Sequence, residues 1–278
     1  MTNRTVGFTI IISTILLILL SLIYMLVVHN GMVQISADFE NETAIWQVWM
    51  MALFPLLVAM TPWKKEKIQS LYKEVPKSTW ILVSLAVALI LVMIATPKIY
   101  VFDLFYIYKL ILLFIIPLII IKRDSVRKAV TVKSVRRWKT PLLVVAVWLV
   151  FYLLNPMSEA SNYEMDFLTL LAGASISLLL NAVLEELFYR KWLQSRLEAA
   201  LGIWPAICVS AVLWALWHTG IQGSGGLIDS TAHALVLHRI MGLFLGYFWA
   251  KYRNIWLLIF MHGLMNFPMY LITMLFER

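Results

Sequence analysis

VGFTIIISTILLILLSLIYMLVV, residues 6–28, is an apolar stretch without a charged side chain. A helix needs about 20 mostly apolar residues to cross the roughly 30 Å hydrocarbon core of a bilayer, so this stretch can span a membrane. It is too long for the core of a signal peptide, and we expect it to stay on the protein as a first span. Similar apolar segments follow at 44–63, 79–96, 99–121, 141–154, 167–188, 204–218, 233–250 and 255–275.

The composition of the whole chain also indicates a membrane protein. Of its 278 residues, 62% are hydrophobic and only 14% are charged, which is too apolar for a soluble domain. The apolar runs are continuous and lack the alternation of a membrane β-barrel. We therefore predict an all-α, polytopic transmembrane helical bundle. It has eight or nine spans, because Asp103 and Lys109 interrupt the fourth segment and the fifth is short.

The basic residues predict the orientation of the bundle. The connections 64–77 and 122–139 are rich in Lys and Arg, whereas the connections 29–43, 155–166 and 219–232 contain neither. This alternation places the N-terminus and the basic loops in the cytoplasm. The net charge of +8 then reports topology and contact with the lipid bilayer, and we expect no nucleic-acid partner. The pattern favours a multi-pass plasma membrane protein of bacterial type.

Ionisable side chains are concentrated in the last four apolar segments. Because such groups are costly inside hydrocarbon, they usually have partners or a function. We therefore divide the chain into N-terminal helices and basic loops (1–140) and a C-terminal domain that carries the chemistry (141–278). We expect Asp103 and Lys109 each to reach the interface or to meet another helix. Cys208 is expected to be a packing residue.

The first polar cluster is Glu185-Glu186-x-x-x-Arg190. Glu186 and Arg190 are four residues apart and can pair on one helix face, while Glu185 points about 100° away and is free to face something else. The second cluster is Trp214-x-x-x-His218, in which the histidine ends an apolar run. Taken alone, each of these clusters can also be an ordinary helix end.

The third cluster is His262-x-x-x-Asn266, in which an imidazole and a carboxamide lie one turn apart on one face. The sequence further predicts that the sixth helix continues to a turn at Gly202. An antiparallel hairpin about this glycine would place Glu186 opposite His218. All three clusters would then converge in the cytoplasmic half of the membrane.

A carboxylate, two imidazoles and an amide in a desolvated cavity suit hydrolysis. Burial makes Glu185 a useful general base, and His218 can share the activated water. His262 and Asn266 can donate hydrogen bonds to a developing oxyanion. One carboxylate and two histidines also form a credible zinc set, so a divalent metal held by Glu185, His218 and His262 stays an alternative. The sequence does not choose between a metal-bound and a glutamate-activated water.

These three ordered motifs resemble those of the CPBP intramembrane proteases, also called the CAAX-protease, Abi or type II prenyl-endopeptidase family. The resemblance covers roughly residues 142–271. It implies a CAAX-endopeptidase-like hydrolase that cleaves a membrane-embedded or lipidated protein or peptide. It also implies Glu185 as general base, His218 as second activator or ligand, and supporting roles for Glu186 and Arg190. It assigns His262 and Asn266 to the oxyanion or to a ligand group.

Two other functions are compatible with the same residues. A non-catalytic membrane immunity or scaffold protein would keep the polar cluster as a link between helices or as a binding site. A transporter is disfavoured, because the chain shows no internal repeat. The eighth segment also carries His233 and His238, which do not share a helix face, so we do not expect them to ligate a metal together. The residues that bind substrate are not identified by the sequence.

Overall fold

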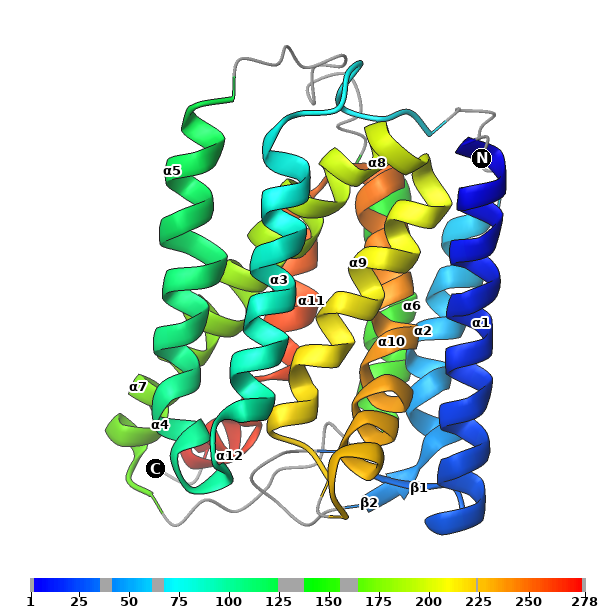
Figure 1. Ribbon diagram of the computed structural model, residues 1–278. Coiled ribbons are helices and arrows are strands. Elements are labelled where there is room, and N and C mark those ends of the chain that lie inside the picture. Colours follow the sequence, from blue (N-terminus) through cyan, green and yellow to red (C-terminus); the bar gives the residue numbers. More distant parts are fainter. Residues whose placement is uncertain are drawn as a thin grey trace.

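The structure is a computed structural model that describes residues 3–35, 42–61, 68–124, 138–155, 165–223 and 225–276. Of the predicted basic connections 64–77 and 122–139, residues 64–67 and 125–137 lie outside the described residues. Within the described part, the chain forms a bundle of helices with one short two-stranded sheet (Figure 1). This confirms the predicted all-α helical fold.

The N-terminal half contributes long apolar helices that match the predicted segments. They are α1 (Asn3–Val28), α2 (Ile45–Met60), α3 (Ser78–Ala95), a continuous run of α4 (Lys98–Lys109), the π-helix η1 (Leu110–Ile115) and α5 (Ile116–Lys122), and then α6 (Lys139–Leu153). A hairpin of β1 (Met32–Gln34) and β2 (Glu42–Ala44), with Val33 opposite Thr43, follows α1. The sequence did not predict this hairpin.

The C-terminal half continues the bundle with a helix that changes type along its length. It comprises α7 (Phe167–Ser177), the π-helices η4 (Leu178–Val183) and η5 (Glu186–Gln194), and α8 (Ser195–Leu201). After it come α9 (Ile203–Trp217), the 3-10 turn η6 (His218–Gly220), α10 (Leu227–Tyr252), α11 (Ile255–Met265) and α12 (Tyr270–Phe276).

Five of the described helical runs are long and apolar enough to cross a membrane. Together, α11 and α12 make a sixth if they count as one span, although they are bent by 79°. The sequence predicted one continuous segment over 255–275. The break follows from Pro268, which cannot continue a helix because it lacks an N–H. The polytopic helical fold is confirmed, and the number of eight or nine spans stays a prediction.

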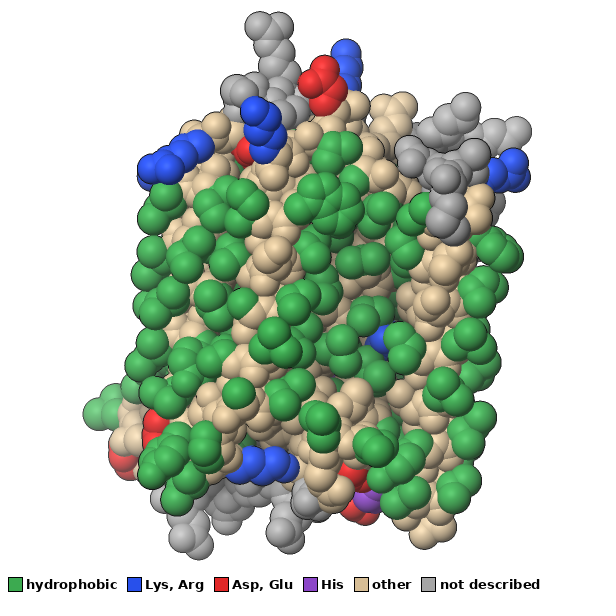
Figure 2. Space-filling model, in the orientation of Figure 1, with side chains coloured by type: hydrophobic (Ala, Val, Ile, Leu, Met, Phe, Trp, Pro, Cys, Tyr) green, Lys and Arg blue, Asp and Glu red, His purple; other side chains and the backbone are tan. Residues whose placement is uncertain are grey.

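The surface carries its charges at the two ends of the bundle. Figure 2 shows hydrophobic side chains over the middle of the visible face, with Lys and Arg gathered mainly at the upper end and acidic groups mainly near the lower end. The N-terminus lies at the upper end of the bundle and the C-terminus at the lower end (Figure 1). An apolar belt between two charged rims is the distribution expected of a membrane protein. The predicted cytoplasmic N-terminus stays a prediction.

Buried ion pairs hold the helix ends together near the turn at Gly202. Arg253 donates to both carboxylate oxygens of Glu198, at 3.0 and 2.6 Å. Arg196 pairs with Asp124 at 3.2 Å. Helix α8 ends as predicted, since Gly202 has a φ of 87° that favours glycine. These contacts fix the ends of α8, α10 and α5 around this turn.

The two halves of the chain share one core. The Trp49 indole on α2 donates to the carbonyl of Val236 on α10 at 2.9 Å, and α1 packs along α9 and α10. Buried residues of both halves belong to the same hydrophobic cluster. The predicted division of the chain at residue 140 stays a prediction. The N-terminal helices pack against the C-terminal helices in this shared core.

Gly220 lets the end of η6 pack directly on α3. A β-carbon at this position would lie 2.7 Å from the carbonyl oxygen of Met93, which is backbone and cannot move easily. We expect Gly220→Ala to lower the free energy of unfolding by about 1–3 kcal/mol, measured by thermal and denaturant unfolding in detergent. The matched control is Gly173→Ala, which meets no atom within 4 Å and should be neutral or slightly stabilising. Equal stability of the two variants would contradict this packing.

Candidate active site

Trp214 lies at the centre of the polar cluster. It is buried on α9, and its indole N–H donates to Glu185 Oε2 at 2.5 Å. The Arg190 guanidinium lies 4.5 Å from the centre of the indole ring. Three imidazole rings meet the indole edge-on with centroids 5.4 to 5.5 Å away, and they belong to His218, His238 and His262. The structure thus brings the three predicted motifs together around one indole.

Glu185 makes two strong contacts with buried donors. Lys109 Nζ contacts its Oε1, and the Trp214 N–H occupies Oε2. A carboxylate has about four acceptor positions, so each oxygen can still accept a hydrogen bond from a water or a substrate group. The sequence predicted Glu185 to be free to face something else. What it faces is an ammonium group and an indole.

Lys109 is the main residue of this cluster that sequence reasoning did not place. It is fully buried at the end of α4, donates to Asn181 Oδ1 at 2.6 Å, and lies 4.0 Å from the ring centre of Trp217. Reaching the interface, one of its two predicted outcomes, is therefore wrong. Meeting another helix, the other outcome, is confirmed. Its partner Glu185 is 76 positions away, too far along the chain for any local pattern to reveal the pair.

Glu186 links the first and third motifs. Its Oε2 pairs with Arg190 Nε at 3.4 Å, which confirms the predicted pair on one helix face. Its Oε1 lies 2.8 Å from His262 Nδ1, and this contact was not predicted. Within the described part of the chain, the Arg190 nitrogens have no hydrogen-bond partner. Arg190 thus forms an ion pair with Glu186 and a cation–π interaction with the ring of Trp214.

In His218 and His262, Nδ1 contacts a protein oxygen, and Nε2 is the nitrogen available for chemistry. His218 Nδ1 lies 2.9 Å from the carbonyl oxygen of Trp214. A carbonyl only accepts hydrogen bonds, so Nδ1 carries the proton and Nε2 keeps its lone pair. In the same way, Glu186 holds Nδ1 of His262. Such a fixed imidazole can act as a base through Nε2 when it is neutral, or donate from Nε2 when it is protonated.

His238 is a second residue that the sequence undervalued. Its ring stacks on that of His218, with centroids 3.5 Å apart and planes at 18°, and its Nε2 lies 3.1 Å from Gln222 Oε1. Asn266 forms the exposed C-terminal cap of α11, and its backbone N–H donates to the His262 carbonyl at 3.3 Å. The sequence predicts His262 and Asn266 on one helix face. In the structure α11 ends at Met265, so Asn266 lies just beyond the helix that carries His262.

The pairing of the two helices about Gly202 differs from the predicted one. Glu185 meets Trp214, and the Tyr189 carbonyl accepts from Ser210 Oγ at 2.9 Å, so Glu186 is not opposite His218. Glu185 and Trp214 are equidistant from a point between residues 199 and 200, and so are Tyr189 and Ser210. The two helices therefore pair about the last turn of α8, just before Gly202. The prediction was wrong because it took the helix-breaking glycine itself as the centre of the hairpin.

The cluster lies well along α9 from the turn. At ~1.5 Å per residue, Trp214 is ~18 Å and His218 ~24 Å along α9 from Gly202. The predicted place of the cluster, in the cytoplasmic half of the membrane, stays a prediction.

The predicted zinc set is not assembled as one compact group. Among the described residues, the one group of three His, Cys, Asp or Glu side chains with ligand atoms within 4.8 Å of one another is His29, Asp229 and His233. Glu185 is instead held by Lys109 and Trp214. The geometry around Trp214 therefore favours an activated water over a metal shared by Glu185, His218 and His262.

The described bundle is a multi-helix membrane protein that buries carboxylates and imidazoles around Trp214. Residues 167–268 match the model of the type II CAAX prenyl endopeptidase family, Rce1-like. This confirms the resemblance inferred from the motifs, over a shorter segment than the predicted 142–271. No curated protein and no solved structure matches the chain. Every predicted site residue from Glu185 to Asn266 lies inside the matched segment, and Lys109 lies outside it.

Proposed function

We propose that this protein is an intramembrane endopeptidase that hydrolyses a peptide bond of a membrane-embedded or lipidated protein or peptide. The observation that carries the proposal is the convergence of Glu185, His218 and His262 on Trp214, in the segment that matches the endopeptidase family. The family supports a CAAX-type protease at the level of the class. The substrate and the roles of the individual residues belong to this proposal.

In the proposed reaction, a water molecule attacks the carbonyl carbon of the scissile peptide bond. Glu185 and the lone pair of His218 Nε2 take the proton of this water, and the C–N bond breaks when the amine leaves with a proton returned from the same groups. No step requires a metal ion. This assignment uses the free acceptor positions of Glu185 and the fixed tautomer of His218.

The developing oxyanion needs donors on the other side of the cluster. His262 acts here as an imidazolium, in which Nδ1–H pairs with Glu186 and Nε2–H donates to the oxyanion. Asn266 supplies a second donor at the end of α11. Removing one such donor typically lowers kcat by 100- to 1,000-fold, roughly 3–4 kcal/mol of transition-state stabilisation. Glu186 and Arg190 support this arrangement by holding His262 and Trp214.

The test is cleavage of a defined probe by the full-length protein in lipid vesicles. The probe is a quenched fluorescent peptide that ends in a farnesylated CAAX sequence, and a second probe is a transmembrane peptide without a lipid. We expect the wild-type protein to cleave at least one of them and His218→Ala to be slower by at least ~100-fold. The control is Lys73→Ala, which removes an exposed side chain that belongs to neither cluster of histidines. Equal rates for the wild type and His218→Ala would count against the proposal.

One observation favours the alternative of a non-catalytic membrane scaffold or immunity protein. Glu185 is already paired with a buried lysine, as expected of a polar link between helices. Under this alternative, His218→Ala would lose stability or partner binding, and neither probe would be cleaved by the wild type. Cleavage that disappears in a folded His218→Ala variant separates the two functions.

A further inference from the structure

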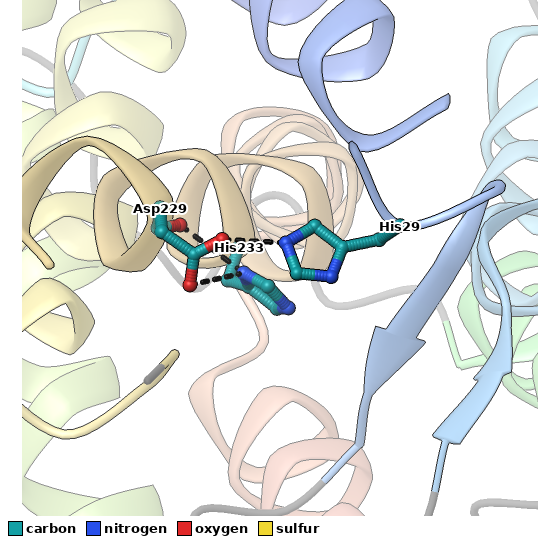
Figure 3. Close-up of side chains that lie close together, drawn as sticks. All are labelled: His29, Asp229 and His233. Atoms are coloured by element: carbon teal, nitrogen blue, oxygen red, sulfur yellow. Dashed lines mark hydrogen bonds and ion pairs between the residues drawn. The ribbon is translucent and has the colours of Figure 1, made fainter. Parts of the chain in front are cut away.

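A second cluster of ionisable side chains lies at the end of the bundle opposite the N-terminus. It consists of His29, Asp229 and His233, which Figure 3 shows pointing toward one another. His29 Nε2 lies 2.5 Å from Asp229 Oδ1, and His233 Nδ1 lies 3.5 Å from Asp229 Oδ2. The two imidazole rings meet edge-on, with centroids 4.7 Å apart. One ligand atom from each side chain lies within 4.8 Å of those of the other two.

The cluster joins parts of the chain that are far apart in sequence. His29 follows α1, and Asp229 and His233 lie on the first turns of α10, 200 positions later. The Asp229 carboxylate is almost fully buried, at 3% exposure, while the His29 side chain is 26% exposed. The carboxylate is therefore removed from water, while one of its two imidazole partners still reaches solvent. None of these residues takes part in the proposed hydrolysis.

Groups around the cluster orient its carboxylate. The Gly225 N–H donates to Asp229 Oδ2 at 3.0 Å, and the Tyr24 hydroxyl lies 3.5 Å from Oδ1. A β-carbon on Gly223 or Gly225 would come within 2.9 Å of Asp229 atoms. The chain between η6 and α10 is therefore wrapped closely around this carboxylate. Partners of this kind fix the direction of a ligand in protein metal sites.

The donor set has the chemistry of a transition-metal site. Imidazole nitrogen and carboxylate oxygen both bind zinc, at about 2.0–2.2 Å. His233 Nδ1 also lies 3.1 Å from the Asp229 carbonyl oxygen and carries a proton there, so metal binding uses Nε2 or releases this proton. Two histidines and one carboxylate then supply three ligands and leave a fourth position for water. The i, i+4 spacing of Asp229 and His233 places them on one face of α10, and His29 approaches that face from α1.

We propose that His29, Asp229 and His233 bind a divalent metal of the zinc class. The bound metal clamps the end of α1 to the start of α10 and to the segment that follows His218. This segment carries Gln222, which contacts His238 beside the candidate active site. The metal would thus stabilise the wall of that site without touching the reacting atoms. The proposal does not depend on the proposed protease activity.

The test is metal binding by the purified full-length protein, produced with an affinity tag that contains no histidine. The protein is stripped with a chelator and titrated with Co²⁺, followed by visible absorption, and then with Zn²⁺, followed by calorimetry and elemental analysis. We expect one metal ion per chain and a higher melting temperature with metal, because a ligand that binds only the folded state stabilises it. His29→Ala and Asp229→Asn should each weaken binding by at least ~10-fold and abolish the thermal shift.

The control is the double variant His218→Ala and His262→Ala, which removes two histidines from the candidate active site, as many as the proposed metal site contains. It should still bind one metal ion with unchanged affinity. Loss of the metal in this variant, with retention in His29→Ala, would place the ion at Trp214 and overturn the proposal. Absence of stoichiometric binding in the wild type would also overturn it. Because His29 is partly exposed, its variant is expected to fold, so loss of binding can be separated from loss of structure.

Discussion

Replacement of Glu185 by glutamine is expected to lower the rate of probe cleavage by 100- to 10,000-fold, the range for loss of a general base. Glutamine has nearly the same shape, but it cannot accept the proton of the attacking water. It also has only one oxygen for the two donors that Glu185 serves, Lys109 and Trp214. One of these donors must therefore face the amide NH₂ group. The measurement is the cleavage rate in vesicles, together with thermal unfolding of the same preparation.

Two controls make the Glu185→Gln result specific. Glu74→Gln replaces an exposed glutamate by the same chemistry and should leave both cleavage and stability unchanged. Glu185→Asp keeps the charge on a shorter side chain and should retain more activity than Glu185→Gln. Activity of Glu185→Gln close to that of the wild type would remove Glu185 from the reaction. The motif would then have to be explained by helix packing alone.

Lys109→Met is expected to have the largest effect on stability. The substitution leaves the buried carboxylate of Glu185 without its cation, and it leaves Asn181 without a donor. Removing one partner of a buried ion pair typically costs 3–5 kcal/mol, because an uncompensated charge stays in a medium of low dielectric constant. The measurement is the change in the free energy of unfolding in detergent. Cleavage should fall as well, because Lys109 positions the carboxylate.

A double-mutant cycle separates these effects of Lys109. The variant with both Lys109→Met and Glu185→Gln buries no unpaired charge, so it should be less destabilised than the sum of the two single variants. Lys109→Arg keeps a cation and should restore part of the cleavage that Lys109→Met loses, which a purely structural role for the volume of the lysine would not predict. Additive destabilisation in the cycle would show that Lys109 and Glu185 do not interact.

Local patterns predicted those features of the fold that depend on neighbours in sequence. Runs of apolar residues gave the positions of the helices, and the spacing of Glu186 and Arg190 gave their ion pair. Gly202, which breaks the helix, predicted the turn that the structure shows at this residue. In each case the cause lies within a few residues of the effect, so a single sequence contains it.

The missed features depend on contacts between distant parts of the chain. Lys109 meets Glu185 only because the end of α4 lies beside the junction of η4 and η5, and His238 joins the cluster only because α10 packs along α9. The two helices pair about the last turn of α8 and not about Gly202. A helix-breaking glycine shows where the chain turns, but the offset between the two helices depends on how their side chains pack.

The depth of the Trp214 cluster has a consequence for the choice of substrate. About 18 Å of α9 separates Trp214 from the turn at Gly202. A peptide in extended form covers this distance with only about five or six residues, at roughly 3.3 Å each. Under the proposed activity, a substrate anchored at the Gly202 end would be cut at a fixed number of residues from its anchor. Residues inserted between the anchor and the cut site would leave this number unchanged. The cut would therefore move towards the anchor in the original sequence, by as many residues as were inserted.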